Sequence, residues 1–267
     1  MQLVQGVRSM VDAVCLVDDA SPCTADGILR ECSGLPGVRV HRFRANAGIA
    51  RSLNLGLGLA RDAGAAWLLT VDQDTAVPAT LVDELCALAS TAAEHGLPVG
   101  AVGPATIAHG DTALAYPIRE EHGFAVTEEI FQSGALWSVD ALTRIGGFDE
   151  HLGIDAVDSA ACLRLRRAGY AIALAPGVTV QHAYGDAQPI RLLGRTVMAT
   201  HHSPQRRESM TRNRLALMGE EWQASPTHAL RTMRRLGMST LLAVTVEDDR
   251  WASARAAFRG LRPRGRR

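Results

Sequence analysis

The stretch "AAWLLTVDQD" at residues 65–74 decides the fold, because an apolar run leads directly to two aspartates. Short apolar runs bounded by polar residues are typical of buried β-strands. In open α/β sheets, ligands lie beyond the carboxyl ends of the strands. Residues two apart in an extended stretch project to the same side, so we expect Asp72 and Asp74 to face one site.

Strand-like and helix-like segments alternate around this stretch. Further strands are expected at residues 12–19, 37–43 and 98–104, and helices at 48–64 and 78–96. This alternation indicates an α/β protein with a mainly parallel, doubly wound, Rossmann-like sheet.

The second half of the chain is more mixed. It contains an expected strand at 129–139, a helix at 155–169, and two short strands around Pro176 and Gly177. From about residue 203 the pattern becomes helical and rich in arginine.

The length of 267 residues suits one large α/β domain with an appendage. We therefore expect a catalytic domain over residues 1–200 and a helical extension over residues 201–267 that packs on it. The formal net charge is zero, so no overall field attracts nucleic acid, and no nucleic-acid partner is expected.

The cysteines and the apolar runs bear on where the protein works. Five cysteines without a CxxC spacing favour reduced thiols over a disulfide framework or a zinc site. We find no signal-peptide pattern at the N-terminus and no apolar run long enough to span a bilayer. These features predict a soluble, cytoplasmic protein, at most peripheral to a membrane.

The paired acids of residues 72–74 suit a hard divalent cation. Carboxylate oxygens are preferred ligands of Mg²⁺, and also of Mn²⁺, ions that commonly bridge phosphates. A second expected strand also ends in acids, at Asp18 and Asp19. The plainer interpretation is that such acids only finish a strand and cap the next helix.

A different chemistry uses a similar motif. Phosphohydrolases of the haloacid dehalogenase type carry an apolar strand followed by DxDxT, with an aspartate nucleophile, and "TVDQDT" at residues 70–75 fits. Such enzymes usually place the motif near the N-terminus and use a downstream basic residue. Here a complete β-α-β-α segment precedes the motif, and the chain has no lysine.

Six segments in order resemble family 2 glycosyltransferases of the GT-A fold, most closely the bacterial rhamnosyltransferase branch. They are "CLVDDAS" (15–21), "RANAGIARSLNLGLGLA" (44–60), "WLLTVDQDT" (67–75), "SGALWSVDALTRIGGFDEHLGIDAVDSAACLRLRRAGY" (133–170), "VTVQHAYGD" (178–186) and "HHSPQRRESMTRNRLAL" (201–217). The resemblance extends over roughly residues 8–262.

This resemblance implies a nucleotide-sugar donor, a dTDP- or UDP-sugar. Asp18 matches the acid that contacts the base or ribose, and Asn46, Gly48 and Arg51 match the loop and helix start beside the nucleotide. A glycine permits close backbone approach, and helix amides attract phosphate.

The resemblance also implies a metal site and a diphosphate clamp. Asp72 and Asp74 match the metal-binding DxD, with Asp72 contacting metal or ribose, and His182 matches a histidine that completes the Mg²⁺ or Mn²⁺ site. Arginines of the 201–217 segment would close near the diphosphate. These are Arg207, Arg212 and Arg214.

Asp158 matches the general base of the family, which accepts the proton of the acceptor hydroxyl during a single inverting displacement. Asp155, one helical turn earlier, would substitute in this role or cap the helix. Ser133, Gly134 and Trp137 match the acceptor side. Trp137 would stack on a sugar or belong to the core.

Two departures from the family pattern stand out. Compared with the family pattern, we expect the chain to start inside the first helix, so either its start is assigned too late or the first strand is missing. A missing strand would bare a strand edge and remove part of the nucleotide pocket. Relatives also carry an acid where Ala160 stands. Because of these departures, a second interpretation stays open, in which the chain is a degenerate, non-catalytic relative of the family.

The C-terminal segment suggests contact with a membrane. Trp251, Phe258 and Leu261 would form an apolar side flanked by arginines, suited to an anionic membrane surface, although a docked or solvated helix explains the pattern too. The flanking arginines are Arg250, Arg255, Arg259 and Arg262.

The sequence thus predicts a metal-dependent, inverting glycosyltransferase. It would move a sugar, with rhamnose as the candidate, from a nucleotide-diphosphate donor to a saccharide acceptor. The expected acceptor is a cell-surface polysaccharide or a lipid-linked saccharide, with peripheral contact at the inner face of the cell membrane.

Overall fold

A computed structural model describes residues 1–110, 112–183, 188–192, 195–199, 202–245 and 250–262. The chain divides into two compact units, which are described separately. The first contains residues 1–153 and 157–183, and the second contains residues 154–156 and 184–267. The boundary thus falls after Ala183, before a β-hairpin, and not at residue 200 as the sequence suggested.

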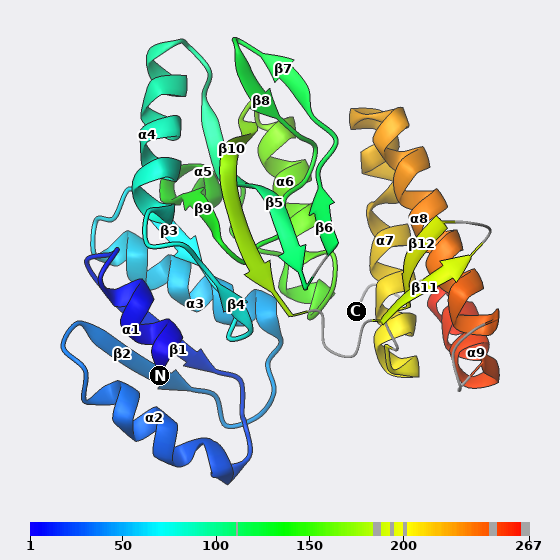
Figure 1. The fold of residues 1–267 in the computed structure, drawn as a ribbon, viewed down its shortest axis with the longest axis horizontal. Helices are drawn as coiled ribbons and strands as arrows, with labels where there is room; N and C mark the ends of the chain where they lie inside the picture. The colour runs from blue at the N-terminus through cyan, green and yellow to red at the C-terminus, as the bar shows by residue number, and fades with distance from the viewer. Residues whose placement is uncertain (111, 184–187, 193–194, 200–201, 246–249, 263–267) are drawn as a thin grey trace. The chain divides into compact units, whose positions relative to one another are not determined.

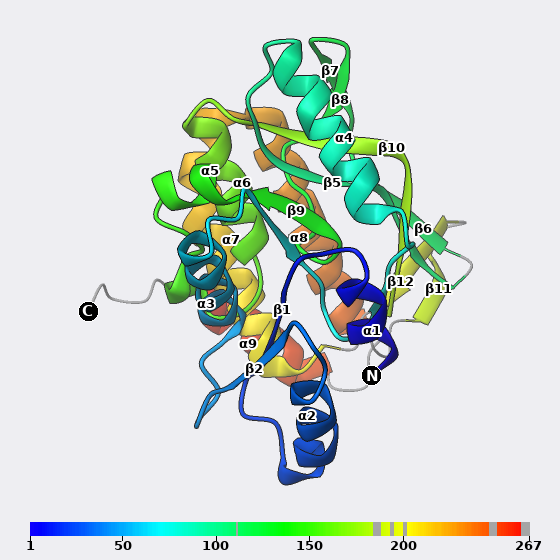
Figure 2. The same ribbon diagram turned by 90° about the vertical axis from the view of Figure 1, so that its left-hand side faces the viewer.

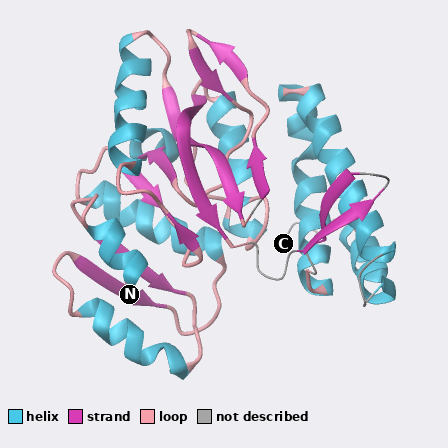
Figure 3. Ribbon diagram, in the orientation of Figure 1, coloured by secondary structure: helices cyan, strands magenta, loops and turns pink. Residues whose placement is uncertain are grey.

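A mixed eight-stranded sheet forms the centre of the first unit (Figures 1 and 3). Its strand order is β3-β9-β5-β10-β8-β7, with β4 beside β10 and β6 beside β5. The strands are β3 (Trp67–Thr70), β4 (Thr75–Ala76), β5 (Val99–His109), β6 (Thr112–Ala115), β7 (Arg119–Glu121), β8 (Phe124–Val126), β9 (Ala135–Ser138) and β10 (Ala171–His182).

Helices cover this sheet and bury its apolar residues. Trp137, Phe148 and Leu165 are among the fully enclosed side chains of the core. Helices α3 and α5 pack together, α4 lies on β5 and β10, and α6 lies on the same two strands. Their bounds are α3 (Ile49–Asp62), α4 (Leu81–Glu94), α5 (Val139–Arg144) and α6 (Val157–Arg167), with a short 3-10 helix η2 (Glu150–Leu152) before α6.

A separate two-stranded parallel sheet lies at the N-terminal end of the unit, as Figures 1 and 2 show. The chain begins with α1 (Gln2–Arg8) and continues through β1 (Val14–Asp18), η1 (Cys23–Ala25), α2 (Asp26–Ser33) and β2 (Val38–Arg42). Within the described residues, β1 pairs with β2 alone and β3 with β9 alone. Helix α3 contacts both β1 and β3.

The predicted α/β class is confirmed, but the sheet is mixed and not mainly built of parallel pairs. β1–β2 and β5–β10 are parallel, whereas β3 and β5 both pair antiparallel with β9. The two short strands expected around Pro176 are one long strand, β10, with a register shift between Ala175 and Thr179. A bulge there accommodates a proline that has no N–H to donate to the ladder.

The second unit is a helical bundle with one β-hairpin. The hairpin joins β11 (Gln188–Leu192) and β12 (Arg195–Ala199), and the helices are α7 (Pro204–Ala224), α8 (Pro226–Thr245) and α9 (Arg250–Gly260). Ser203 caps α7 by accepting the Arg206 N–H, and Pro204 stands where a helix needs no donor. Among the described helices, none combines the length and apolar character needed to cross a bilayer.

Candidate metal and nucleotide site

Asp72, Asp74 and His182 come together at the end of the main sheet. One ligand atom from each side chain lies within 4.8 Å of the other two. The sequence expected strand alternation to align the two acids, but Asp74 lies in a turn closed by the Thr75 N–H donating to the Asp72 carbonyl, at 3.1 Å. The turn, not the strand, brings the carboxylates to one side.

Strand pairing delivers the histidine to this site. The short strand β4 runs antiparallel to the end of β10 and sets Thr75 opposite His182. A hydrogen bond from the Ala183 N–H to the Asp74 carbonyl, at 3.1 Å, continues the pairing. His182 Nδ1 therefore lies 3.5 Å from Asp74 Oδ1, although the two residues are far apart in sequence.

Two buried hydroxyl groups hold the site together. Ser133 Oγ accepts the Asp72 N–H and donates to Thr75 Oγ1, each at 2.7 Å. Thr75 Oγ1 in turn bonds His182 Nδ1 at 2.7 Å. The three strand ends that carry Asp72, Ser133 and His182 are thereby linked, which limits the motion of the histidine ring.

The electrostatics of the site suit a cation. Burial and, to a smaller extent, the charge of Asp74 raise the pKa of Asp72 to about 6, against the opposing hydrogen bond from the Gln132 amide. Burial lowers the pKa of His182, against the opposing charge of Asp74. A neutral imidazole beside two carboxylates is the protonation state that metal binding requires.

Asp18 and Asp19, the other acidic strand end, are bonded to the protein itself. Asp18 Oδ2 lies 2.9 Å from Arg42 Nε, and the Asp18 side chain is 6% exposed. The Asp19 carboxylate accepts the N–H groups of Ala47 at 2.6 Å and Gly48 at 2.9 Å. The backbone N–H groups before α3, which the sequence predicted would bind phosphate, therefore donate to Asp19 instead.

The loop before α3 places the other predicted nucleotide residues. Gly48 has φ +85°, and a Cβ there would stand 2.8 Å from the Gly153 carbonyl oxygen. Its glycine is therefore required by the approach of another backbone segment. Asn46 and Arg51 are exposed, and the Arg51 guanidinium lies over the Phe43 ring at 5.5 Å.

Asp158 lies in the first turn of α6, as predicted, and is half-buried. The aligned peptides of a helix N-terminus stabilise a carboxylate there. Ser159 Oγ donates to Glu129 Oε2 at 2.6 Å and lies 3.4 Å from Asp158 Oδ1. Glu129 is therefore a second acid beside the predicted base. The separation of 30 residues gave no sequence signal for it.

The acceptor-side residues have mainly structural roles here. Trp137 is fully buried, donates from Nε1 to Thr70 Oγ1 at 2.8 Å and packs edge-on against Phe148. It therefore belongs to the core and does not present a stacking face. Gly134, at φ +81°, leaves room for Val180, whose Cγ1 would stand 2.9 Å from an added Cβ.

Asp155 belongs to the second unit, where Arg206 Nη2 lies 3.2 Å from its Oδ1. Asp155 and Ala156 both have positive φ, and Asn213 donates to the carbonyls of residues 154 and 155. Burial raises the pKa of Asp155, against the opposing charge of Arg206. These contacts give Asp155 an anchoring role within its unit.

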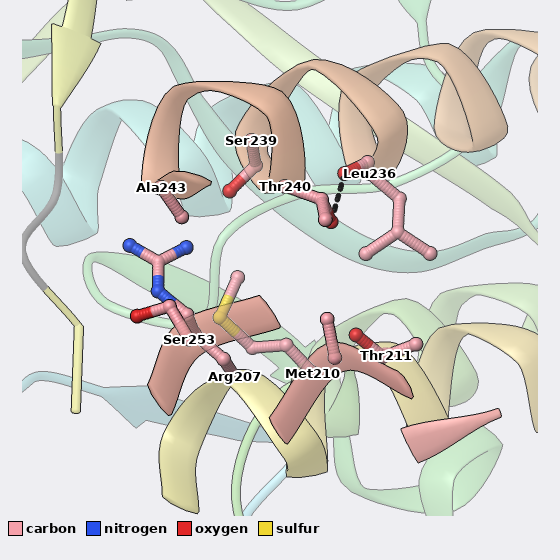
Figure 4. Close-up of a pocket in the computed structure, with 9 residues that line it drawn as sticks. Arg207, Met210, Thr211, Leu236, Ser239, Thr240, Ala243 and Ser253 are labelled. Carbon is pink, nitrogen blue, oxygen red and sulfur yellow. Dashed lines mark hydrogen bonds between the residues drawn. The ribbon is translucent and has the colours of Figure 1, made fainter. Parts of the chain in front are cut away.

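The predicted phosphate-binding arginines also lie in the second unit. Arg207 is 4% exposed and lines a small cavity among α7, α8 and α9 with Met210, Leu236 and Ala243 (Figure 4). Arg212 pairs with Glu208 on the same helix. Arg214 is half-buried and acts electrostatically on Asp155.

Sequence reasoning missed Gln132 and Thr75, and it placed Ser133 on the acceptor side. Gln132 Nε2 donates to Asp72 Oδ1 at 2.8 Å, and Ser133 and Thr75 form the hydroxyl link. Thr75 and Ser133 stand in two of the quoted segments and Gln132 directly precedes the second, but nothing in either segment predicted that the two would meet.

Solved structures with a similar fold are glycosyltransferases. TarS 1–349 of S. aureus in complex with UDP-GlcNAc matches with a TM-score of 0.58 and 13% identity, over 96% of this chain and 74% of that one. GalNAc-T7 with UDP, GalNAc and Mn²⁺ matches with a TM-score of 0.53 and 14% identity, over 86% of this chain and 49% of that one. The fold is therefore that of the GT-A glycosyltransferases.

Sequence comparisons find similarity to glycosyltransferases. Residues 2–120 match glycosyl transferase family 2. The dTDP-rhamnosyl transferase RfbF of Shigella flexneri is 28% identical over 188 residues, which cover 65% of this chain and 60% of that protein. The chain is thus similar in sequence to glycosyl transferase family 2 over residues 2–120 and to a rhamnosyltransferase, in line with the resemblance that its six motifs indicated. It spans about 60% of the length of this curated relative.

Proposed function

We propose that this chain is a metal-dependent, inverting glycosyltransferase that uses a nucleotide-diphosphate sugar as donor. The observation that carries the proposal is the meeting of Asp72, Asp74 and His182, whose ligand atoms lie within 4.8 Å of one another. The three residues come from separate segments of the sheet and are held by buried hydrogen bonds. The match of residues 2–120 to glycosyl transferase family 2 and the GT-A fold support the same function.

The ligand set fits Mg²⁺ or Mn²⁺. Carboxylates are hard ligands that both ions accept, and an imidazole suits Mn²⁺ better than Mg²⁺. The Asp74 side chain is 44% exposed, so the acid can reach both the ion and a ligand in solvent. When bound, the ion neutralises the diphosphate as it becomes the leaving group.

Asp158 is the proposed general base. Its carboxylate accepts the proton of the acceptor hydroxyl while that oxygen forms a bond to the anomeric carbon. The bond from this carbon to the diphosphate oxygen breaks in the same step, and the diphosphate leaves with the electron pair. Attack from the opposite side inverts the configuration, and the first-turn position in α6 supports an ionised base.

The donor and acceptor are proposed from relatives. The similarity to a dTDP-rhamnosyl transferase supports dTDP-rhamnose, and the likeness to a fold solved with UDP-GlcNAc keeps UDP-sugars among the candidates. Asp18, Asn46, Gly48 and Arg51 remain the proposed nucleotide-binding residues. The proposed acceptor is a cell-surface polysaccharide or a lipid-linked saccharide, glycosylated in the cytoplasm.

A screen of nucleotide-sugars tests this function. With Mn²⁺ present, we expect dTDP-rhamnose or a UDP-sugar to raise the melting temperature and to release free nucleotide diphosphate in the presence of acceptor. Binding without any transfer would favour a degenerate relative. Phosphate release from p-nitrophenyl phosphate without nucleotide would favour the phosphohydrolase.

The proposed base has a test of its own. Asp158→Asn should lower transfer by about 10²- to 10⁴-fold and leave donor binding unchanged, because the amide keeps the shape but cannot accept the proton. Asp149→Asn, at an aspartate that caps η2, is the matched control. Wild-type rates in Asp158→Asn would remove Asp158 from the mechanism.

A further inference from the structure

Helix α9 turns its large apolar residues away from the bundle. Trp251 is 79% exposed, Phe258 72% and Leu261, just after the helix, 54%. Trp251 and Phe258 are seven residues apart, or two helical turns, so they lie on the same side. Soluble proteins rarely expose this much aromatic surface to water. Contiguous exposed apolar patches generally mark interaction sites.

The opposite side of α9 explains why the aromatic residues face outward. Ser253, Ala256 and Gly260 are buried there. A Cβ on Gly260 would stand 2.6 Å from Thr211 Cβ and 2.7 Å from the Glu208 carbonyl oxygen. The helix therefore docks on α7 mainly through its small residues, and its aromatic residues remain largely exposed.

Arginines alternate with the aromatic residues along the outward side. Arg255 follows Trp251 by four residues, which sets its guanidinium one turn beyond the ring. Arg262 is exposed just beyond the end of the helix at Gly260. Residues 250–262 contain four arginines and no acid. Arg259 lies 3.0 Å from Glu208 of α7, at the flank of this side.

We propose that the outward side of α9 docks on an anionic lipid bilayer. This surface, the α9 face, consists of Trp251, Arg255, Phe258, Leu261 and Arg262. Aromatic rings settle at the level of the lipid headgroups, and arginines beside them bind lipid phosphates. The single convex helix suits a flat, fluid partner that carries negative charge.

The proposal of membrane docking depends only on the α9 face and not on the proposed enzymatic function. A further step, in which the docked enzyme takes its acceptor from the bilayer, rests on the proposed glycosyltransferase function. In that case, the α9 face favours a lipid-linked acceptor over a soluble polysaccharide. A second copy of the chain is the competing occupant of this surface, and the experiment separates the two.

Sedimentation with lipid vesicles tests the proposal. The full chain should bind vesicles containing phosphatidylglycerol at least tenfold more tightly than vesicles of phosphatidylcholine alone, and high salt should weaken the binding. Trp251→Ser with Phe258→Ser should lower the binding at least tenfold, and so should Arg255→Glu with Arg262→Glu. Lipids brominated on their acyl chains should quench tryptophan fluorescence in the wild type but not in Trp251→Phe.

Trp222→Ser is the matched control. Trp222 is also exposed, but it lies 11 residues beyond Thr211 on α7, roughly 16 Å along the helix axis. Its replacement should leave vesicle binding unchanged. Circular dichroism checks that each variant folds.

Two results would overturn the proposal. One is equal vesicle binding by the wild type and both double variants. The other is a concentration-dependent dimer in ultracentrifugation that Trp251→Ser with Phe258→Ser abolishes, together with no binding to vesicles. The assay needs neither nucleotide nor metal, so Asp74→Ala should bind vesicles like the wild type even if no sugar transfer is found.

Discussion

Two strand ends in this chain have nearly the same sequence and very different surroundings. β1 leads into Asp18 and Asp19, and β3 leads into Asp72 and Asp74. At the first, Arg42 and two backbone N–H groups satisfy the carboxylates. At the second, the acids face each other and His182, and no arginine pairs with either of them in the part of the chain that the structure describes.

The difference shows what an acidic strand end needs to become a cation site. A carboxylate that already has an arginine or an amide partner contributes to the fold and attracts a cation weakly. A pair that is partly desolvated and mutually repelling has a free-energy cost that a divalent ion removes. The comparison predicts that substitutions at the two ends act on different measurable quantities.

Asp74→Ala should have the largest effect and should act on function. Losing one of two carboxylate ligands should lower sugar transfer by about 10³-fold, because the ion stabilises the departing diphosphate. The gain in melting temperature with Mn²⁺ should disappear in the same variant. The urea concentration at the midpoint of unfolding of the metal-free protein should change little, since Asp74 is partly exposed.

Asp62→Ala is the control for this prediction, because Asp62 is an exposed acid at the end of α3. It should bind Mn²⁺ like the wild type. Retention of the Mn²⁺ effect in Asp74→Ala would place the cation elsewhere and would remove the distinction between the two strand ends.

The raised pKa of Asp72 should make the metal-free protein more stable at lower pH. An acid whose pKa is about 6 in the folded state, against 3.8 ordinarily, binds its proton more tightly when folded. Its ionisation therefore opposes folding above pH 6, and this cost vanishes as the pH falls toward 4. The upper bound is about 3 kcal/mol of unfolding free energy.

Asp72→Asn isolates this effect from other titrating groups. In EDTA at pH 7, the variant should be more stable than the wild type toward urea, and the difference should shrink as the pH falls from 7 to 4. A difference that stays constant over this range would show that Asp72 is not the responsible group.

Much of the fold could be predicted from the sequence because its signals are local. The apolar run before Asp72, the proline and glycine that bound α4, and the four-residue spacing of Ile49, Leu53 and Leu57 specify their elements without tertiary information. The short strands over residues 112–126 were not predicted, because three- and four-residue strands have too few residues to show a period.

The site could be predicted in its residues but not in its geometry. The DxD and the histidine were identified from motifs, whereas the turn at Thr75 and the link through Ser133 depend on pairings between distant segments. The environment of Asp19 was missed for the same reason. The sequence of a strand that ends in two acids is the same whether the carboxylates bind a cation or accept a backbone N–H from a residue 28 positions later, as Asp19 does.

Asp19→Ala should act on stability and not on the cation. Removing its carboxylate leaves the N–H groups of Ala47 and Gly48 without their acceptor, at a cost of about 2 kcal/mol in unfolding free energy. Urea unfolding measures this loss. The affinity for Mn²⁺ in folded protein should remain that of the wild type.

Asp19→Asn should recover part of this stability, since the amide oxygen still accepts one hydrogen bond. A loss of Mn²⁺ binding in Asp19→Ala, without a change in urea stability, would contradict the structural role of the first strand end.

Thr75→Val should have the smallest effect and should sharpen the comparison at the second strand end. Valine keeps the shape of the buried threonine but removes the hydroxyl that joins Ser133 to His182. Indirect partners of this kind typically contribute 10- to 100-fold to metal affinity, and about tenfold is expected here because Asp72 and Asp74 remain. Titration with Mn²⁺, followed by electron paramagnetic resonance, measures it.

Thr75→Ser keeps the hydroxyl and should restore the affinity, which a purely steric role of the threonine would not do. The apparent affinity for Mn²⁺ should fall in Thr75→Val while the rate at saturating Mn²⁺ stays near that of the wild type, because the ligands themselves are intact. Equal loss in the valine and serine variants would show that packing of the threonine methyl, and not the hydroxyl link to His182, orders the acids of the second strand end.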